Sequence, residues 1–494
     1  MLGTDTLPAL LRDAAERFGD HPAYVEGPRT VSYAELLHLV EATSRVYVDN
    51  GAGRGDRVVL WGPNSIDWAV AALAVTYAGG ALVPVNSRYV GAEVADVVGR
   101  TDAALVVVHD GFLGRDQVGE LHAAGVDDGR VVTLDGLMAR AATAEGLQHE
   151  DDVTPDDVAD ILFTSGTTGR SKGAMSAHRQ TIGVARAWAE LGGVRRDDRY
   201  LVVNPFFHSF GYKIGIVVGL LTGATLYPVA TFDADETMRL IETEQITVLP
   251  GAPTIYQSLL AAPGRTDRDL SSLRLAVTGA AVVPVVLIER MREELGIDQV
   301  VTAFGMTEAV VVTMCRAGDP AELVATTCGR AIPGMETRIA APSGSGPGEL
   351  LVRGDYVMLG YLDDPQATAD AIDADGWLHT GDVGVLDQDG NLTITDRLKD
   401  MYISGGFNVY PAEVEQALAR MDGVADVAVV GVPDERMGEV GKAYVVGSTT
   451  PEEVVAFARE RLANFKVPRH VEVVAALPRN LSGKVLKREL RDGS

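Results

Sequence analysis

Along the first 150 residues, short apolar runs alternate with longer segments in which apolar residues recur at helical spacing. The apolar runs have the length and the β-branched content of buried strands. They cover residues 58–61, 81–85 and 104–108. Helices are predicted before and between them, over 32–49, 65–78 and 91–100. Such alternation is typical of βαβ units, so the pattern predicts an α/β fold with a mainly parallel sheet.

Beyond residue 150, further strand-like runs end in loops. They cover residues 161–163, 200–203, 246–249, 273–277 and 300–303. Helices are predicted from residue 179 onward and over 214–221. The pattern then turns to short strands at 349–353 and 392–395, with a turn at Gly360-Tyr361. A separate α+β pattern begins near residue 400, which predicts a second, smaller domain.

Composition narrows the class of protein. A chain of 494 residues is too long for one compact core, so at least two domains are expected. The net charge of −26 argues against general binding to nucleic acid or to anionic membranes. Cys315 and Cys328 form neither a disulfide framework nor a metal-binding spacing, which fits a reducing cytoplasm.

No segment predicts insertion into a membrane or secretion. The apolar run at 68–85 is broken by Gly79-Gly80 and by Pro84, so it predicts a buried helix, a turn and a buried strand. The N-terminus lacks a basic region followed by an apolar stretch and predicts an amphipathic helix.

The candidate chemistry begins with the loop that follows the strand at 161–163. Its hydroxyl groups, glycines and terminal lysine could wrap and neutralise a phosphate chain. It contains Thr164, Ser165, Gly166, Thr167, Thr168, Gly169, Arg170, Lys172 and Gly173. The spacing does not fit the P-loop, because glycine follows Lys172 where that motif has Ser or Thr. A polar hairpin turn between two strands is the alternative.

The unbroken string from Thr164 to Gly173 resembles the phosphate loop of the adenylate-forming superfamily. This superfamily contains acyl-CoA synthetases, aryl-CoA ligases, luciferases and the adenylation domains of peptide synthetases. The resemblance extends in order over nearly the whole chain. It implies a fold with two doubly wound βα subdomains and a small β-barrel in a large N-terminal domain, followed by a small mobile α+β C-terminal domain. The implied boundaries are 1–396, a hinge at 397–399, and 400–494.

The segment Asn204–Gly211 resembles the family's aromatic gate, which implies that His208 flanks the acyl pocket and the thiol tunnel. A core histidine with one satisfied nitrogen is the alternative. No acid lies near the gate, which argues against an α-amino-acid substrate. Lys213 is interpreted either as a surface lysine with a snorkelling side chain or as a contact to a substrate carbonyl. The implied acyl pocket is lined by His208, Phe210, Lys213, Gly251, Ala252, Gly279, Phe304 and Val310.

The resemblance also assigns the ATP site. An adenine-side segment contains Gly279, Ala280 and Ala281. The family's aromatic-Gly-x-Thr-Glu motif matches Phe304, Gly305, Met306, Thr307 and Glu308, with Phe304 where the family usually has Tyr. Thr307 would meet the α-phosphate, and Glu308 with Thr168 would hold Mg²⁺, which prefers oxygen ligands. Asp382 would bind the ribose hydroxyls, with Arg397 near ribose and phosphate.

Three further family motifs fall in the small domain and at its start. Lys399 matches the hinge residue. Ser404, Gly405 and Gly406 match the segment past which the pantetheine arm of CoA runs. Lys484 matches the lysine that completes the adenylation site.

These parts together imply an ATP-dependent, AMP-forming acid–CoA ligase with Lys484, His208, Thr307 and Glu308 at its centre. Several segments resemble actinobacterial CoA ligases for a steroid-derived indanedione propionate. A bulky apolar or ring-bearing acid such as a steroid-derived bicyclic propionate, or a fatty acid, is therefore expected, with ATP, Mg²⁺ and CoA. The alternatives are another acceptor, namely a carrier protein, an amine or nitrite with an aryl amine, or a non-catalytic scaffold. A homodimer is compatible with the sequence.

Overall fold

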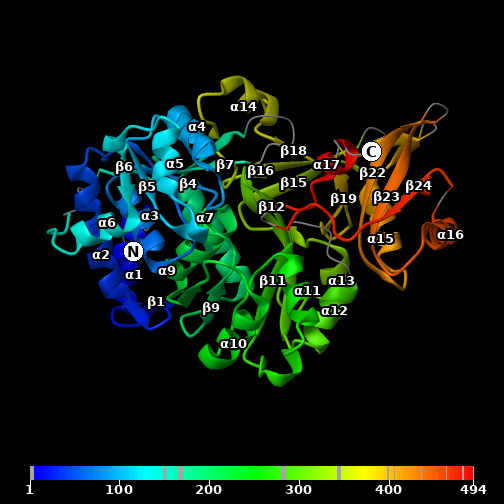
Figure 1. Cartoon of the computed structure of the whole chain (residues 1–494), viewed down its shortest axis with the longest axis horizontal. Coiled ribbons are helices and arrows are strands. Elements are labelled where there is room, and N and C mark those ends of the chain that lie inside the picture. The colour runs from blue at the N-terminus through cyan, green and yellow to red at the C-terminus, as the bar shows by residue number, and fades with distance from the viewer. Residues whose placement is uncertain are drawn as a thin grey trace.

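The computed structural model shows a large α/β region and a smaller C-terminal region (Figure 1). It describes residues 5–147, 152–164, 171–279, 285–341, 346–397, 400–404, 407–434, 437–462, 464–480 and 483–492.

The first sheet carries the hairpin on which the predicted phosphate loop is built. Its strands run in the order β17-β8-β7-β4-β3-β5-β6. They are β3 (Arg57–Trp61), β4 (Ala81–Val85), β5 (Leu105–Val108), β6 (Val131–Thr133), β7 (Val158–Phe163), β8 (Gly173–Ala177) and β17 (Gly360–Tyr361). The pairs among β3, β4, β5, β6 and β7 are parallel, as the alternating pattern predicts, whereas β8 and β17 add antiparallel pairs at one edge.

The second sheet brings the later predicted motifs to a neighbouring layer. It consists of the ladders β2-β1-β10-β9 and β11-β12-β13-β14, joined by single bridges from Val248 to Tyr200 and to Leu275. Its strands are β1 (Pro22–Glu26), β2 (Arg29–Ser32), β9 (Arg199–Val202), β10 (Thr225–Pro228), β11 (Leu275–Gly279), β12 (Gln299–Met306), β13 (Ala309–Met314) and β14 (Arg330–Ala331). The strand predicted at 246–249 is therefore wrong as a full strand, since only Val248 forms bridges there.

Helices pack around these sheets with their apolar sides buried. They are α1 (Leu7–Phe18), α2 (Tyr33–Asp49), α3 (Ile66–Tyr77), α4 (Gly91–Thr101), α5 (Gln117–Ala123), α6 (Leu134–Ala141), α7 (His178–Gly192), α10 (Ala234–Glu244), α11 (Pro253–Ala261), α12 (Val285–Glu293), α13 (Ala321–Thr326) and α14 (Pro365–Ala371). The apolar run at 68–85 folds as predicted, because α3 is buried along its whole length and a turn leads into β4. The helix predicted over 214–221 begins as a π-helix at Tyr212–Val217 and continues as α9 (Val218–Thr222), after a short turn, α8 (Ser209–Gly211).

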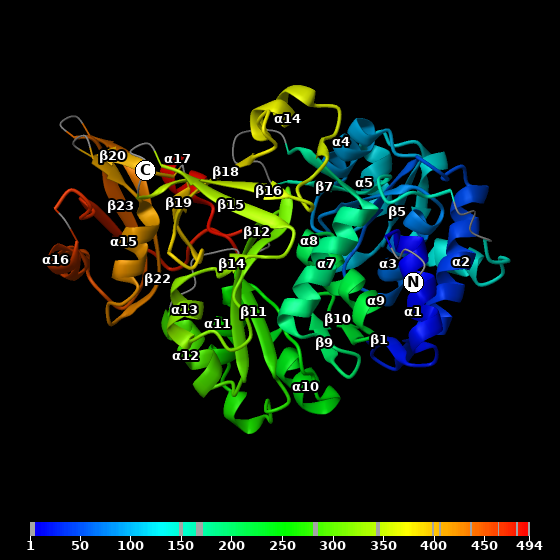
Figure 2. The same ribbon diagram turned by 180° about the vertical axis from the view of Figure 1, so that it is seen from behind.

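An antiparallel sheet lies where the small barrel is predicted, between the large α/β region and the C-terminal region (Figures 1 and 2). Its order is β15-β16-β18-β19. The strands are β15 (Met335–Ala340), β16 (Gly348–Gly354), β18 (Leu378–Leu386) and β19 (Leu392–Arg397).

The C-terminal region has its own hydrophobic cores, which supports its description as a separate domain. Its elements are β20 (Tyr402–Ser404), β21 (Phe407–Val409), α15 (Pro411–Leu418), β22 (Val424–Asp434), β23 (Gly438–Gly447), α16 (Pro451–Arg461), β24 (His470–Val473) and α17 (Lys487–Asp492). One core packs Val414 and Val454 against Val429, and another packs Leu490 against Val430 and Tyr444. The predicted α/β class with a small α+β C-terminal domain is confirmed.

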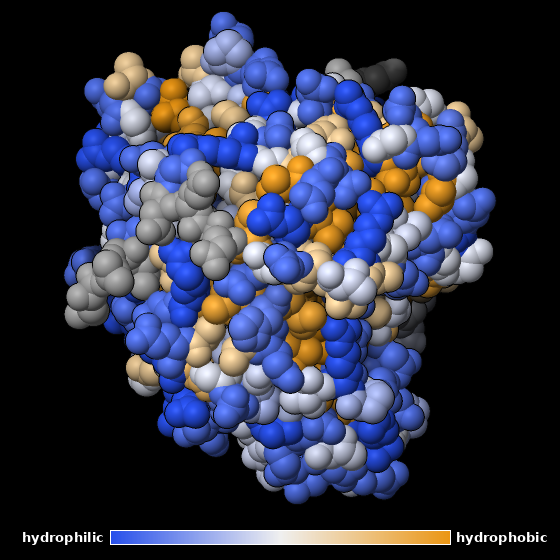
Figure 3. Space-filling model, turned by 90° about the vertical axis from the view of Figure 1, so that its left-hand side faces the viewer, coloured by the Kyte–Doolittle hydropathy of each residue, from blue (hydrophilic) through white to orange (hydrophobic). Residues whose placement is uncertain are grey.

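The surface carries many polar residues, as expected of a globular chain. On the face at the left-hand side of Figure 1, blue polar residues separate the orange apolar areas (Figure 3). Across the described part of the chain, we find no helix long and apolar enough to span a bilayer.

Candidate active site

The predicted phosphate loop is closed at its base by a backbone hydrogen bond. The Thr164 N–H donates to the Lys172 carbonyl over 2.9 Å, where β7 turns back as β8. A Cβ at Gly173 would lie 2.9 Å from the Ile161 side chain, so this position has little room for another residue. Ser165, Gly166, Thr167, Thr168 and Gly169 lie outside the described residues. The hairpin interpretation is therefore correct for the strands, and it is compatible with a phosphate-binding role for the loop.

Two residues assigned to the triphosphate both contact Tyr361, which was predicted only as part of a turn. The Tyr361 hydroxyl donates to Glu308 Oε1 over 2.7 Å, and the Lys172 ammonium lies 4.8 Å from the centre of the Tyr361 ring. Glu308 is 8% exposed. Gly360-Tyr361 is therefore not the simple turn that was predicted but strand β17, paired with β8 beside the loop. Its pairing places the phenol between a carboxylate and a cation.

Thr307 and Glu308 form the tight turn between β12 and β13. Phe304, Gly305 and Met306 continue β12, and β13 returns antiparallel to it, so this loop end is a hairpin turn. A Cβ at Gly305 would come within 2.0 Å of the Val310 carbonyl, so only glycine allows this close approach. The turn thus presents a hydroxyl and a carboxylate side by side.

The loops after the neighbouring strands are joined by hydrogen bonds. The Asn204 side chain donates to the Pro250 carbonyl over 3.0 Å, and the Gly251 N–H donates to the Val277 carbonyl over 3.0 Å. Gly279, at the end of β11, pairs in register with Ala303 of β12. Ala280 and Ala281 lie outside the described residues. The carboxyl ends of β9, β11 and β12 therefore meet at one edge, where open α/β sheets bind ligands.

His208 is the N-cap of the short turn α8 and keeps part of its surface open to solvent. Its Nδ1 accepts the Phe210 N–H over 3.2 Å, which leaves the ring proton on Nε2. The surrounding protein lowers the pKa of the imidazole by desolvation. The core-histidine alternative is wrong, and the structure presents a neutral N–H donor at the gate.

The gate is anchored on its inner side. Phe206 is fully buried, with its ring 5.3 Å from Trp68 and its N–H bonded to Asn64 Oδ1 over 2.6 Å. The half-buried Phe210 meets Trp188 edge-on at 6.1 Å. Contacts of Phe206 and Phe210 with the core thus anchor the segment that carries His208.

Lys213 is neither a surface lysine nor free to contact a substrate. Its side chain is 1% exposed, and its ammonium lies 3.0 Å from Asp160 Oδ1. It also donates to Ser176 Oγ over 2.8 Å. The snorkelling interpretation is wrong, and the assignment of Lys213 to the lining of the acyl pocket is not supported, because the π-helix turns its side chain into the core between β7 and β8.

The other residues assigned to the acyl pocket lie on the strand ends and loops around the gate. Gly251 and Val310 are buried, whereas Ala252 and Phe304 are half-buried. The Lys213 ammonium is paired with Asp160 and does not reach these residues. The described lining of the assigned acyl pocket is therefore largely neutral.

The residues assigned to the ribose come from facing strands. Asp382 on β18 pairs in register with Arg397 on β19. Asp382 is 3% exposed, and its N–H donates to Thr380 Oγ1 over 3.1 Å. The side chain of Arg397 lies outside the described residues, as does Lys399. The register brings both residues to the same end of the sheet.

The small domain contacts the large one beside Lys484. Lys484 N donates to Asn480 Oδ1 over 2.9 Å within a tight loop. Gly483 has a φ of +80°, and a Cβ there would lie 2.8 Å from Thr254 Oγ1 at the start of α11. Ser404 is buried on β20, while Gly405 and Gly406 lie outside the described residues. The Lys484 loop thus lies against the helix that follows Gly251 and Ala252.

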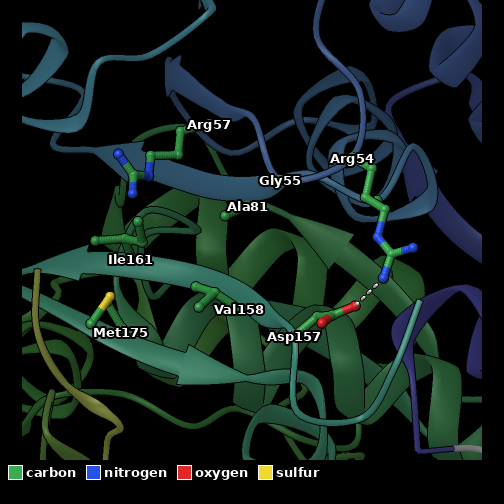
Figure 4. A pocket seen from close by; sticks show the side chains of 9 residues that line it. Arg54, Gly55, Arg57, Ala81, Asp157, Val158, Ile161 and Met175 are labelled. Atoms are coloured by element: carbon green, nitrogen blue, oxygen red, sulfur yellow. Dashed lines mark ion pairs between the residues drawn. The ribbon is translucent and has the colours of Figure 1, made fainter. Parts of the chain in front are cut away.

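A separate pocket lies at the opposite end of the first sheet, where β3, β4 and β7 begin (Figure 4). Arg54 crosses its mouth and pairs with Asp157 at 3.6 Å and with Asp152 at 2.6 Å. This pocket is therefore distinct from the candidate active site, which lies at the carboxyl ends of the strands.

Comparisons with known proteins agree with this arrangement. A family described as AMP-binding enzyme matches residues 11–362, and its C-terminal domain matches residues 413–484. The chain is 55% identical to the 3-[(3aS,4S,7aS)-7a-methyl-1,5-dioxo-octahydro-1H-inden-4-yl]propanoyl:CoA ligase of Rhodococcus jostii, over 99% of this chain and 98% of the relative. It is 53% identical to the ligase of the same name from Mycobacterium tuberculosis, with the same coverage.

Among solved structures, the chain resembles MatB from Rhodopseudomonas palustris, at 31% identity over 99% of this chain and 98% of MatB. The TM-score is 0.91 with the ATP-bound form and 0.81 with the apo form.

Proposed function

Because the chain belongs to the AMP-binding enzyme family, we propose that it is an acid–CoA ligase whose substrate is a propionic acid attached to a fused bicyclic ring system bearing ketones. The observation that carries this proposal is the identity above half, over nearly the full length, to two ligases named for such a substrate. The predicted superfamily and the predicted class of enzyme, an AMP-forming acyl-CoA synthetase, are confirmed at this level. ATP and CoA are the co-substrates of such ligases.

The proposed reaction has two steps. An oxygen of the substrate carboxylate attacks the α-phosphorus of ATP, the bond to the bridging oxygen breaks, and pyrophosphate leaves. The CoA sulfur, having lost its proton, then attacks the acyl carbon of the adenylate, and the C–O bond to AMP breaks. In the first step, negative charge gathers on phosphoryl oxygens, so fixed cations and N–H or O–H donors aimed at them accelerate the reaction.

We assign the charge-stabilising roles to Lys172, Thr307 and Lys484. Lys172 lies at the base of the phosphate loop and Thr307 at the turn beside Glu308. Lys484 would reach the same edge from the small domain, which is supported by the contact of its loop with Thr254. The neutral His208 would position the acid through its Nε2–H.

The donor set fits Mg²⁺. The magnesium ion usually uses one or two protein carboxylates together with water and phosphate oxygens, so a dedicated cluster is not needed. Within the described ranges, no three His, Cys, Asp or Glu side chains gather as a metal site. Glu308 is a buried carboxylate near Lys172 and would hold the ion with Thr168. Bound there, Mg²⁺ would neutralise charge on the phosphates.

We place the domain boundary at the hinge, with residues 1–396 and 400–494 as the two domains and 397–399 between them. The higher TM-score with ATP-bound MatB supports an adenylation-like arrangement. Rotation about Lys399 would then withdraw Lys484 and bring Ser404, Gly405 and Gly406 to the pantetheine arm.

One protomer carries every assigned residue, so the proposal does not require a homodimer. A cytoplasmic location, where ATP and CoA are present, is part of the proposal.

Product analysis by mass spectrometry tests the function. The enzyme is mixed with ATP, Mg²⁺ and one acid from a panel containing the indanedione propionate, fatty acids and aryl acids, with and without CoA. We expect AMP and the bicyclic acyl-CoA, formed at the highest kcat/KM in the panel. A thioester formed only with fatty or aryl acids would refute the substrate class. AMP without any thioester would refute CoA as the acceptor and direct attention to an amine, a carrier protein or nitrite.

A further inference from the structure

The buried ion pair between Lys213 and Asp160 joins two parts of the site that are far apart in the sequence. Asp160 lies on β7, four residues before Thr164, and Lys213 lies five residues after His208. Asp160 is 0% exposed and Lys213 is 1% exposed. The pair therefore connects the hairpin of the phosphate loop to the helix behind the gate.

Lys213 contacts both strands of the hairpin. Asp160 and Ser176 are cross-strand partners on β7 and β8. The Lys213 ammonium forms an ion pair with the Asp160 carboxylate at 3.0 Å and donates to the Ser176 hydroxyl over 2.8 Å. On the opposite side, the Thr181 hydroxyl of α7 donates to Asp160 Oδ2 over 2.6 Å. Four buried side chains thus form one polar cluster in an apolar core.

The helix geometry brings Lys213 into this cluster. Lys213 is the second residue of the π-helix at Tyr212–Val217, which follows the gate turn without a break. The Tyr212 N–H donates to the His208 carbonyl over 3.0 Å, so the gate histidine and the start of the π-helix are one hydrogen-bonded unit. π-helical turns are rare and occur mostly at functional sites.

Stability does not require this pair. Two apolar side chains of similar volume would fill such a site about as well, whereas removing one charge leaves the other buried and unpaired. A buried pair therefore fixes one relative position of the elements that carry it. We propose that the Asp160–Lys213 pair is a positioning device that couples occupancy of the phosphate loop to the position of the gate, so that nucleotide binding orders the acid-binding side.

This inference rests on the proposed function, because it requires the loop to bind ATP. The test compares wild type with the double variant Asp160→Val/Lys213→Met, which replaces both charges by apolar groups. The single variant Lys213→Met leaves the Asp160 carboxylate unpaired and should lower the Tm strongly. The double variant should return the Tm to within a few degrees of wild type, which separates folding from coupling.

The readout is hydrogen exchange of peptides covering 204–217, with and without α,β-methylene-ATP and Mg²⁺. Neither the acid nor CoA is needed. In wild type, saturating nucleotide should slow exchange of this segment by at least about fivefold, the low end of measured couplings between sites. In the double variant the change should fall below about twofold, while the Kd for the nucleotide stays within about threefold of wild type.

The matched control removes another ion pair whose carboxylate is buried. Arg274 Nε lies 2.8 Å from Asp198 Oδ1, just before β9 and β11 begin, at the end of the sheet opposite the gate. Asp198→Ala/Arg274→Met should leave the nucleotide response of 204–217 unchanged.

Unchanged protection in the Asp160/Lys213 double variant would overturn the coupling, and so would nucleotide binding to wild type without any protection of the gate. A wild-type protein that does not bind the nucleotide would instead remove the proposed function on which the inference rests.

Discussion

The nucleotide side of the large domain and the Lys484 loop of the small domain are built in opposite ways. Around the phosphate hairpin, Lys172, Glu308 and Lys213 are held by partners in fixed elements, namely Tyr361, Asp160 and Ser176. Lys484 lies on a loop of a domain with separate cores and approaches the large domain at Thr254. We therefore expect changes in the large domain to affect both half-reactions, and changes in the small domain to affect one half-reaction at a time.

The largest effect is expected from Lys484→Ala. Removing a cation aimed at the transition state should slow adenylation by at least about 100-fold. Thioester formation from supplied acyl-adenylate and CoA should stay within about threefold of wild type, because in the proposed cycle Lys484 is withdrawn before that step. Rapid-quench assays of each half-reaction measure both rates.

Lys466→Ala is the control for this variant, because Lys466 pairs with Glu413 within the small domain at 2.5 Å. Equal losses in the two half-reactions of Lys484→Ala would contradict a role confined to adenylation.

Gly406→Leu tests the other half of the cycle. A side chain beside the pantetheine arm should slow thioester formation by about tenfold or more, the penalty expected of a misplaced reactant. Adenylation, measured as pyrophosphate release, should be unchanged. Normal CoA turnover in this variant would remove the tunnel assignment.

Tyr361→Phe should act on the large-domain side with a smaller effect. It keeps the ring beside Lys172 and removes the hydrogen bond to Glu308, a bond to a charged group worth about 1.5–3 kcal/mol. We expect adenylation to fall by about tenfold or more and to need more Mg²⁺. A Mg²⁺ titration of the adenylation rate is the measurement.

Tyr356→Phe is the matched control, because Tyr356 also precedes α14 and its hydroxyl lies beside Gly334. An unaltered Mg²⁺ dependence in Tyr361→Phe would show that the phenol does not position the carboxylate.

The smallest effect concerns pH. Desolvation lowers the pKa of His208 from 6.5, so the ring takes up a proton only at lower pH and is neutral at pH 7. Protonation would turn Nδ1 into a donor and break its bond from the Phe210 N–H. The acid limb of the adenylation kcat/KM profile should therefore have its midpoint below 6.5. A midpoint near 7 that disappears in His208→Gln would contradict this assignment.

Much of the fold was predictable because buried helices and strands produce recognisable apolar patterns in the sequence. Strands β3, β4 and β5 and helices α2, α3 and α4 lie within a few residues of their predicted ranges. Helices α2 and α4 bury one apolar face, whereas α3 and the strands are apolar almost throughout. The run at 246–249 is equally apolar but forms only one pair of bridges, at Val248. Apolar composition predicted its burial correctly, and only the tertiary structure decides its pairing.

The sequence predicted which loop ends form the site, but it did not predict the contacts that Tyr361 and Lys213 make there. Tyr361 resembled a turn residue because its strand is only two residues long and its partner, β8, lies far away in the sequence. Lys213 resembled a surface cation because its carboxylate partner is 53 positions away, at Asp160. Pairings of this kind depend on which strands meet, and that information is not local.

The contact between Gly483 and Thr254 has a consequence for how quickly the two domains can separate. It brings together a residue without a side chain and a small hydroxyl-bearing one, so little apolar area needs to return to water when it opens. In the proposed cycle this contact must form and open once in every turnover. A side chain at position 483 would instead collide with Thr254 and keep this contact from forming, so the adenylation step would be slowed.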